Sequence, residues 1–146
     1  MFPIQLPTYN VKLKKENELT YIFDVIRKKY LVLTPEEWVR QHLIHLLINK
    51  YGYPKGLFGI EKGHSFNNLQ KRTDLLIYNT EGEIILLCEC KAHSENINQT
   101  VLEQAMNYNL VIKSPLILIS NGIQTFCFEK QGSNFTQLPD IPTCNY

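Results

Sequence analysis

Three charged residues, Asp74, Glu89 and Lys91, stand at the ends of two stretches that are otherwise apolar. Residues 73–78 and 83–91 have the composition of two strands of a hairpin, and the second is so continuously aliphatic that both of its faces should be covered. Because side chains alternate along a strand, Glu89 and Lys91 are expected on one face. The start of the first strand faces the end of the second, so Asp74 and Glu89 are expected to converge.

Two carboxylates beside an ammonium group have a specific chemical use. Hard cations such as Mg²⁺, with Mn²⁺ as a substitute, choose oxygen ligands and keep several waters. A metal held there can activate a water for attack on a phosphodiester, with Lys91 orienting that water or neutralising the developing charge. The alternative is an ion pair at a strand end. Charges there are costly unless paired or metal-bound, and a pattern as short as D-x₁₄-E-x-K also recurs by chance.

A second group of polar residues lies on an expected helix at 98–111. Gln104 and Tyr108 are four residues apart, so they share one helix face. The packing side is assigned instead to Leu102, Ala105, Met106 and Leu110. This leaves Gln104 and Tyr108 to contact a polar site, although a Gln-x-x-x-Tyr spacing is by itself a weak signal.

The other elements can be placed by their boundary residues. Thr34, Pro35 and Glu37 suit the N-cap, first and third positions of a helix that runs to about Lys50. Strands are expected at 21–23, 30–33, 57–61, 116–120 and 124–128, with an irregular tail after them. The first two should form a hairpin around the basic turn Arg27-Lys28-Lys29. The order predicts an α/β domain with a mixed sheet, flanking helices and an N-terminal β-hairpin.

The amino-acid composition excludes several classes of protein. The 146 residues are 44% hydrophobic and 20% charged with a net charge of +1, which fits one globular domain over 1–146 and excludes a disordered chain or a strongly basic DNA-coating protein. No apolar run could span a membrane, and no signal peptide is apparent. The four cysteines suggest buried thiols in a reducing cytoplasm. The first thirty residues carry six basic and three acidic side chains, a net +3.

Together these motifs resemble the PD-(D/E)xK nuclease superfamily, with the Q-x-x-x-Y motif of its RecB-like branch at 104–108. More narrowly, the chain is similar to the N-terminal domain of type I restriction enzyme R proteins from about Tyr21 to Ile141. The matching segments, in order, are LTPEEWVRQ at 33–41, GYP at 52–54, KRTD at 71–74, ECKA at 89–92 and NLV at 109–111. Thr73 stands where the superfamily name has proline.

The resemblance implies a restriction-endonuclease-like core and a role for each matching residue. Asp74 and Glu89 would bind the metal together with the backbone carbonyl of Cys90, and Lys91 would be the catalytic lysine. The helical acid of the family fits Glu37 better than Glu36, and Glu37 could also complete the helix cap. Gln104 and Tyr108 would support the site or DNA. Basic residues that could contact phosphates are Arg27, Lys28, Lys29, Arg40, Lys62, Lys71 and Arg72.

The implied activity is Mg²⁺-dependent cleavage of DNA. R proteins join this domain to a DNA translocase, and this chain carries no P-loop, so cleavage would proceed without its own motor or with a motor or specificity subunit as partner. Such nucleases often cut as dimers, which leaves a homodimer open. The alternatives are a non-catalytic DNA- or protein-binding module that keeps the fold, and a small α/β protein with a surface ion-pair network.

Overall fold

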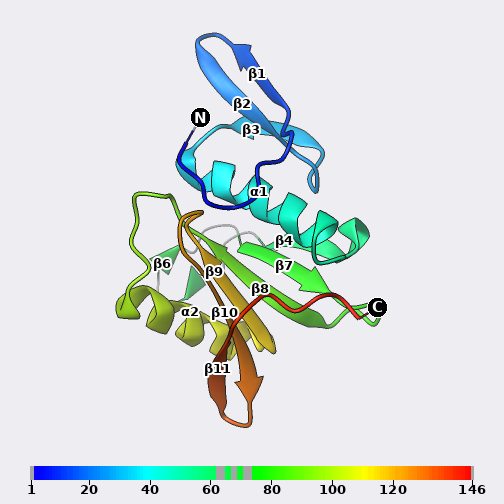
Figure 1. The fold of residues 1–146 in the computed structure, drawn as a ribbon, viewed down its shortest axis with the longest axis vertical. Coiled ribbons are helices and arrows are strands. Elements are labelled where there is room, and N and C mark those ends of the chain that lie inside the picture. The colour runs from blue at the N-terminus through cyan, green and yellow to red at the C-terminus, as the bar shows by residue number, and fades with distance from the viewer. Residues whose placement is uncertain (1, 62–64, 67–68, 71–73, 146) are drawn as a thin grey trace.

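The computed structural model describes residues 2–145 apart from 62–64, 67–68 and 71–73, and over 61–74 it describes strand positions only. The main sheet has six strands in the order β11-β10-β9-β8-β7-β4. Their bounds are β4 Phe58–Glu61, β7 Asp74–Tyr78, β8 Ile84–Cys90, β9 Leu116–Ser120, β10 Thr125–Gln131 and β11 Asn134–Leu138. β8 and β9 are parallel, and the other neighbours are antiparallel. The mixed α/β prediction is therefore confirmed (Figure 1).

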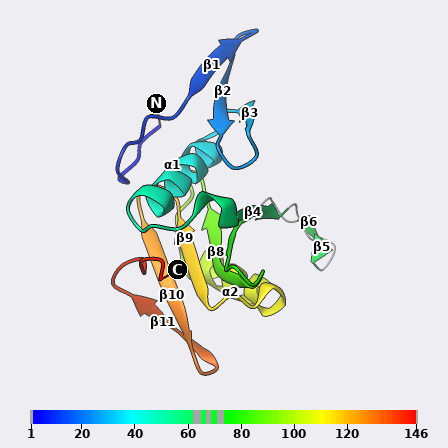
Figure 2. The ribbon, with the colours of Figure 1, turned by 90° about the vertical axis from the view of Figure 1, so that its right-hand side faces the viewer.

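Two helices pack on opposite faces of this sheet (Figure 2). Helix α1, Pro35–Asn49, begins where its cap predicts, since the Thr34 hydroxyl accepts from the Glu37 N–H at 3.0 Å. Its apolar stripe packs on one face of β8, where it meets Leu86, Cys88 and Cys90. Helix α2, Gln99–Ile112, is capped by Asn98 and lies on the other face. Alternation along β8 thus divides its side chains between the two helices.

The N-terminal part forms a separate sheet of three antiparallel strands, β1 Leu13–Glu16, β2 Leu19–Asp24 and β3 Lys29–Val32. It projects from the end of α1 away from the main sheet (Figure 1). The predicted hairpin corresponds to β2 and β3. β1 was not predicted, because its four exposed residues, Leu-Lys-Lys-Glu, show no apolar alternation.

Three further elements complete the described structure. The short strands β5, Ser65–Phe66, and β6, Leu69–Gln70, pair with each other, and a 3₁₀ turn, η1, covers Lys55–Leu57. The expectation of an irregular tail was wrong for residues 134–138, because β11 pairs there with β10, whereas residues 139–145 carry no helix or strand. No helix in the described part of the chain is long and apolar enough to cross a membrane.

The cysteines are reduced and, with one exception, buried, as the sequence predicts. Cys88, Cys90 and Cys127 are buried and Cys144 is partly exposed. The Sγ atoms of Cys88 and Cys90 lie 3.9 Å apart on the α1 face of β8. Their shared hydrogen bond and burial raise the pKa of the Cys88 thiol, which keeps it protonated.

Candidate active site

Glu89 is a buried carboxylate near the end of the central strand β8. Only 4% of the residue is exposed. Its neighbours Cys88 and Cys90 belong to the α1 face, whereas Leu87 packs with Leu76 and Tyr108 on the α2 face. Glu89 therefore lies on the α2 face, where a charged group needs a partner or an ion to balance its burial.

Asp74 begins the neighbouring strand β7 and stands opposite Glu89 in the register. Leu75 pairs with Cys88 in the antiparallel β7–β8 ladder, so the next position along sets Asp74 across from Glu89. Such opposed positions hold side chains on one face of the sheet. The side-chain position of Asp74 lies outside the described residues, and the backbone alone supports the expected convergence.

The backbone around Cys90 indicates how close this pair is. The Lys91 N–H donates to the Ser120 carbonyl of β9 at 2.8 Å. In a trans peptide the preceding C=O points the other way, so the Cys90 carbonyl is directed toward β7, the strand that carries Asp74. Backbone N–H and C=O groups of successive residues point to opposite sides of a strand, so those of Glu89 point toward β9 and away from Asp74. Asp74 and Glu89 therefore form a non-hydrogen-bonded pair, the type in which the two Cα atoms lie about 4.5 Å apart.

Lys91 follows the last residue of β8, and its N–H continues the hydrogen-bonding ladder with β9. Alternation places its side chain on the Glu89 side, as predicted. The side chain is 12% exposed, and its Nζ lies 3.9 Å from a Glu95 carboxylate oxygen that is itself half exposed. A lysine held at the edge of the protein interior by one distant partner can still reach a substrate phosphate.

Helix α2 contributes Tyr108 and Gln104 to the same face. Tyr108 is 1% exposed and packs on Leu76 and Leu87. Since α2 connects two parallel strands, it runs opposite to β8. Tyr108 packs on Leu87. Gln104 lies four residues before Tyr108, about 6 Å back along the helix, and Glu89 lies two residues after Leu87, about 6.6 Å forward along the strand. Gln104, which is exposed, is therefore level with Glu89.

The division of α2 between packing and site differs from the prediction at Leu110, which was assigned to the packing side and is 72% exposed. Tyr108 is buried, and its contact with a polar site stays a prediction. The helix packs through Ala105 and Tyr108, with Leu102 and Met106 partly buried beside them. The Q-x-x-x-Y pair thus joins a packing residue to an exposed amide.

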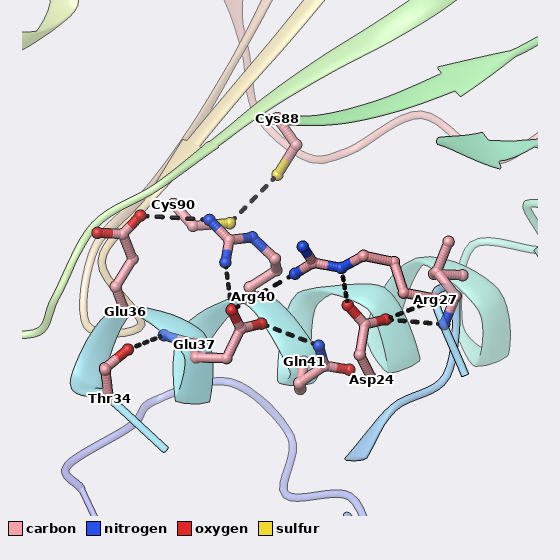
Figure 3. Close-up of polar contacts among 10 residues, drawn as sticks. Asp24, Arg27, Thr34, Glu36, Glu37, Arg40, Gln41, Cys88 and Cys90 are labelled. Atoms are coloured by element: carbon pink, nitrogen blue, oxygen red, sulfur yellow. Dashed lines mark hydrogen bonds and ion pairs between the residues drawn. The ribbon is translucent and has the colours of Figure 1, made fainter. Parts of the chain in front are cut away.

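Glu37 lies in a different environment, on the α1 face (Figure 3). Its Oε1 accepts from Arg40 Nη1 at 2.6 Å and its Oε2 from Gln41 Nε2 at 3.0 Å. Arg27 Nη2 lies 3.8 Å from the same Oε1. The carboxylate is therefore engaged with its own helix and the N-terminal sheet. None of these three partners is Glu89.

Arg40 and Arg27 belong to this network as well. Arg40 has a side chain only 7% exposed and also binds Glu36 at 3.2 Å, while Arg27 Nε donates to the fully buried Asp24 at 2.7 Å. The charges of Cys90, Glu37 and Glu36 raise the pKa of Arg40 above its ordinary value, against an opposing effect of burial. Burial removes Arg40 from the candidates for phosphate contact, whereas Lys28 and Lys29 are exposed.

The network itself was not foreseen from the sequence. Its signal was the spacing Glu36, Glu37 and Arg40, which are three or four residues apart and so adjacent on a helix. Asp24 gave no such signal, because its partner Arg27 was read as part of a solvated turn. Three other predicted contact residues, Lys62, Lys71 and Arg72, lie outside the described residues.

The donor set beside the end of β8 suits a hard divalent cation. It comprises a buried carboxylate at Glu89, the Cys90 carbonyl directed toward β7 and the position of Asp74 opposite, which are all oxygen ligands. Among the side chains that the structure describes, no three His, Cys, Asp or Glu groups lie close enough to hold a metal. The second carboxylate of the proposed donor set is that of Asp74, whose side chain is outside the described residues.

Comparison with known families shows which protein family the chain belongs to. Residues 35–142, from the start of α1 to the tail after β11, match the family model described as type I restriction enzyme R protein N terminus. The chain belongs to this family. The match includes every predicted site residue from Glu37 to Tyr108, and it excludes the three-stranded N-terminal sheet. No curated protein matches the chain.

Proposed function

We propose that this R protein N-terminal domain is a Mg²⁺-dependent DNA endonuclease. The observation that carries the proposal is the position of Glu89, a buried carboxylate opposite Asp74 and followed by Lys91 on the same face. Membership of the restriction enzyme family supports DNA as the substrate and a motor or specificity subunit as a partner. A bound cation would polarise the scissile phosphodiester and lower the pKa of the attacking water.

The protein groups have separate tasks in this proposal. Asp74, Glu89 and the Cys90 carbonyl hold the ion with oxygen ligands. Lys91 places its ammonium group beside the phosphate, where it orients the attacking water and offsets the added negative charge. Gln104 supports this arrangement from the helix, level with Glu89. Glu37 acts at a distance, by fixing the end of α1 against the N-terminal sheet.

The test is cleavage of supercoiled and linear DNA with Mg²⁺, Mn²⁺ or EDTA. We expect cleavage with either metal, none in EDTA, and a loss of at least 100-fold in Asp74→Asn, Glu89→Gln and Lys91→Ala. Glu103→Gln is the matched control, because this α2 residue is an exposed carboxylate that contacts Gln99. Cleavage that persists in Lys91→Ala would assign the activity to a contaminant. A well-folded protein that cleaves no substrate would instead be a non-catalytic binding module.

A further inference from the structure

The outer face of the N-terminal sheet carries three partly exposed aromatic rings and two lysines. The ribbon of this sheet projects away from the main sheet (Figure 2). In the strand register Lys14 stands opposite Tyr21, and Tyr21 opposite Val32, while Phe23 stands opposite Tyr30. These side chains share one face. The other face of the sheet carries Ile22 and Asp24, both fully buried, and is turned toward α1.

Contacts within the outer face show that its rings are accessible. The Phe23 and Tyr30 rings meet edge to face with centroids 5.2 Å apart. Lys14 Nζ lies 4.4 Å from the Tyr30 centroid and 5.8 Å from that of Tyr21, and Lys12 Nζ lies 5.6 Å from that of Phe23. All three rings are partly exposed beside these lysines.

The face is unusual for a solvated surface because large apolar groups join the rings. Leu19 is 48% exposed and Val32 47% exposed on the same side of the sheet. An exposed patch of this kind commonly marks an interaction site. Lys12 and Lys14 share this face with one strand acid, Glu16, whose carboxylate lies 3.4 Å from Lys14 Nζ, so the face keeps a small positive excess. The partner should therefore combine flat apolar groups with negative charge.

We propose that this outer face binds a single strand of DNA. Single-stranded nucleic acid offers unstacked bases for the rings and phosphates for the lysines, which is the combination that strand-binding proteins use. Lys12 and Lys14 can move from ring to phosphate when a base stacks, because both are exposed and the ion pair of Lys14 with Glu16 is a solvent-exposed surface pair. A duplex keeps its bases stacked and offers phosphates alone. The inference depends on the proposed nuclease function in one respect, the choice of DNA as the nucleic acid that is bound.

This surface lies outside the family match, which begins at residue 35. It is connected to the candidate active-site domain through Arg27, which links Asp24 of the sheet to Glu37 of α1. A strand held on the outer face would thus be attached to a sheet fixed against the end of α1. The expected role is to retain one strand near the nuclease site.

Binding of a fluorescein-labelled dT15 oligonucleotide, followed by anisotropy in EDTA, tests the proposal without cleavage. We expect Tyr21→Val/Tyr30→Val to weaken binding at least ten-fold, since stacking contributes about 1–3 kcal/mol per base. Valine keeps the strand propensity, and circular dichroism checks the fold. The affinity for a duplex of the same length should change less than two-fold.

Two adjacent lysines give a matched pair of variants. Lys14 and Lys15 follow each other on β1 and point to opposite faces, so Lys14→Ala and Lys15→Ala remove the same charge from the same strand. Only Lys14→Ala should weaken dT15 binding and reduce its dependence on salt. Equal effects of the two would mean nonspecific attraction by the charged sheet, and would overturn the proposal.

The two proposals can fail separately. Glu89→Gln should abolish cleavage and leave dT15 binding unchanged. If wild-type protein does not bind dT15 in EDTA, or if the tyrosine variant binds it as well as wild type does, the outer face is not a strand-binding surface. Metal-dependent cleavage that survives in that variant would still support the nuclease.

Discussion

At the scale of single residues, the buried pair of Arg40 and Glu37 is the most consequential interaction that the structure adds. Both side chains are at most 9% exposed, and their atoms approach to 2.6 Å. Removal of one member of such a pair leaves the other charge buried without compensation, which is the costly case. The resemblance predicts a site role for Glu37, and under that prediction its partner Arg40 determines whether the acid is available to an ion.

Replacement of Arg40 by alanine should therefore destabilise the protein strongly. We expect a loss of about 3 kcal/mol in the free energy of unfolding, because Glu37 would keep only Gln41 and the more distant Arg27. Urea unfolding followed by fluorescence of Trp38, the single tryptophan, measures it. Lys28→Ala, which removes an exposed charge, should change stability by less than 0.5 kcal/mol, roughly the usual range for surface sites. A similarly small change for Arg40→Ala would show that Glu37 gains water freely.

At the scale of elements, the sequence predicts those parts whose boundaries have local causes. Helix α1 begins at Pro35 because Thr34 can cap it, and α2 begins at Gln99 because Asn98 does the same. The β7–β8 hairpin follows from its aliphatic run and the turn at Asn79. β11 could not be predicted this way, because only pairing with β10 makes an extended strand of a polar segment that ends at prolines.

The candidate site was predictable to a similar extent. Alternation alone placed Glu89 and Lys91 on one face, and the hairpin placed Asp74 opposite. Which helix covers that face was not predictable, since it depends on the right-handed crossover through α2. For this reason the burial of Tyr108 and the position of Glu37 on the other face appear only in the folded structure.

The C-terminal segment is an element fixed by a few polar contacts. The Tyr51 hydroxyl donates to Asp140 at 2.7 Å, and the Tyr53 hydroxyl to the Pro142 carbonyl at 2.7 Å. The bond from Tyr51, together with the Ile141 N–H, lowers the pKa of Asp140 below its ordinary value, while burial and the bond to Asp140 raise the pKa of Tyr51. Docking of the tail should therefore depend on pH.

The sign follows from the lowered pKa of Asp140. This contribution to stability is present above the unfolded-state pKa of about 3.9 and is lost as pH falls through the lower folded-state value. We expect wild type to exceed Tyr51→Phe in free energy of unfolding at pH 6, by a modest amount because Asp140 is exposed. The difference should shrink below pH 4. Urea unfolding at both pH values measures it, and a difference independent of pH would contradict the assignment to this bond.

At the scale of the whole molecule, a net charge of +1 conceals two regions of opposite sign. The first thirty residues are net +3, so the rest of the chain is net −2. The basic part includes the projecting sheet β1–β3 (Figure 1), and the acidic part contains Asp74 and Glu89. The two proposals use these regions differently, since a strand needs the basic sheet and a cation needs the acids. A near-neutral total is therefore compatible with a DNA-cleaving domain.

Cation binding should stabilise the whole fold, because the proposed ligands lie on the neighbouring inner strands β7 and β8 of the main sheet. A ligand that binds only the folded state adds about 2.7 kcal/mol at one hundred times its dissociation constant. For a chain of this size that corresponds to a rise in melting temperature of about 5–10 °C. We expect Mg²⁺ to produce such a rise in wild type and in Glu103→Gln, and to produce none in Glu89→Gln or Asp74→Asn. Calorimetry in Mg²⁺ and in EDTA measures it without reference to activity. An equal shift in all four proteins would place the cation elsewhere, since Glu89 and Asp74 would then not be its ligands.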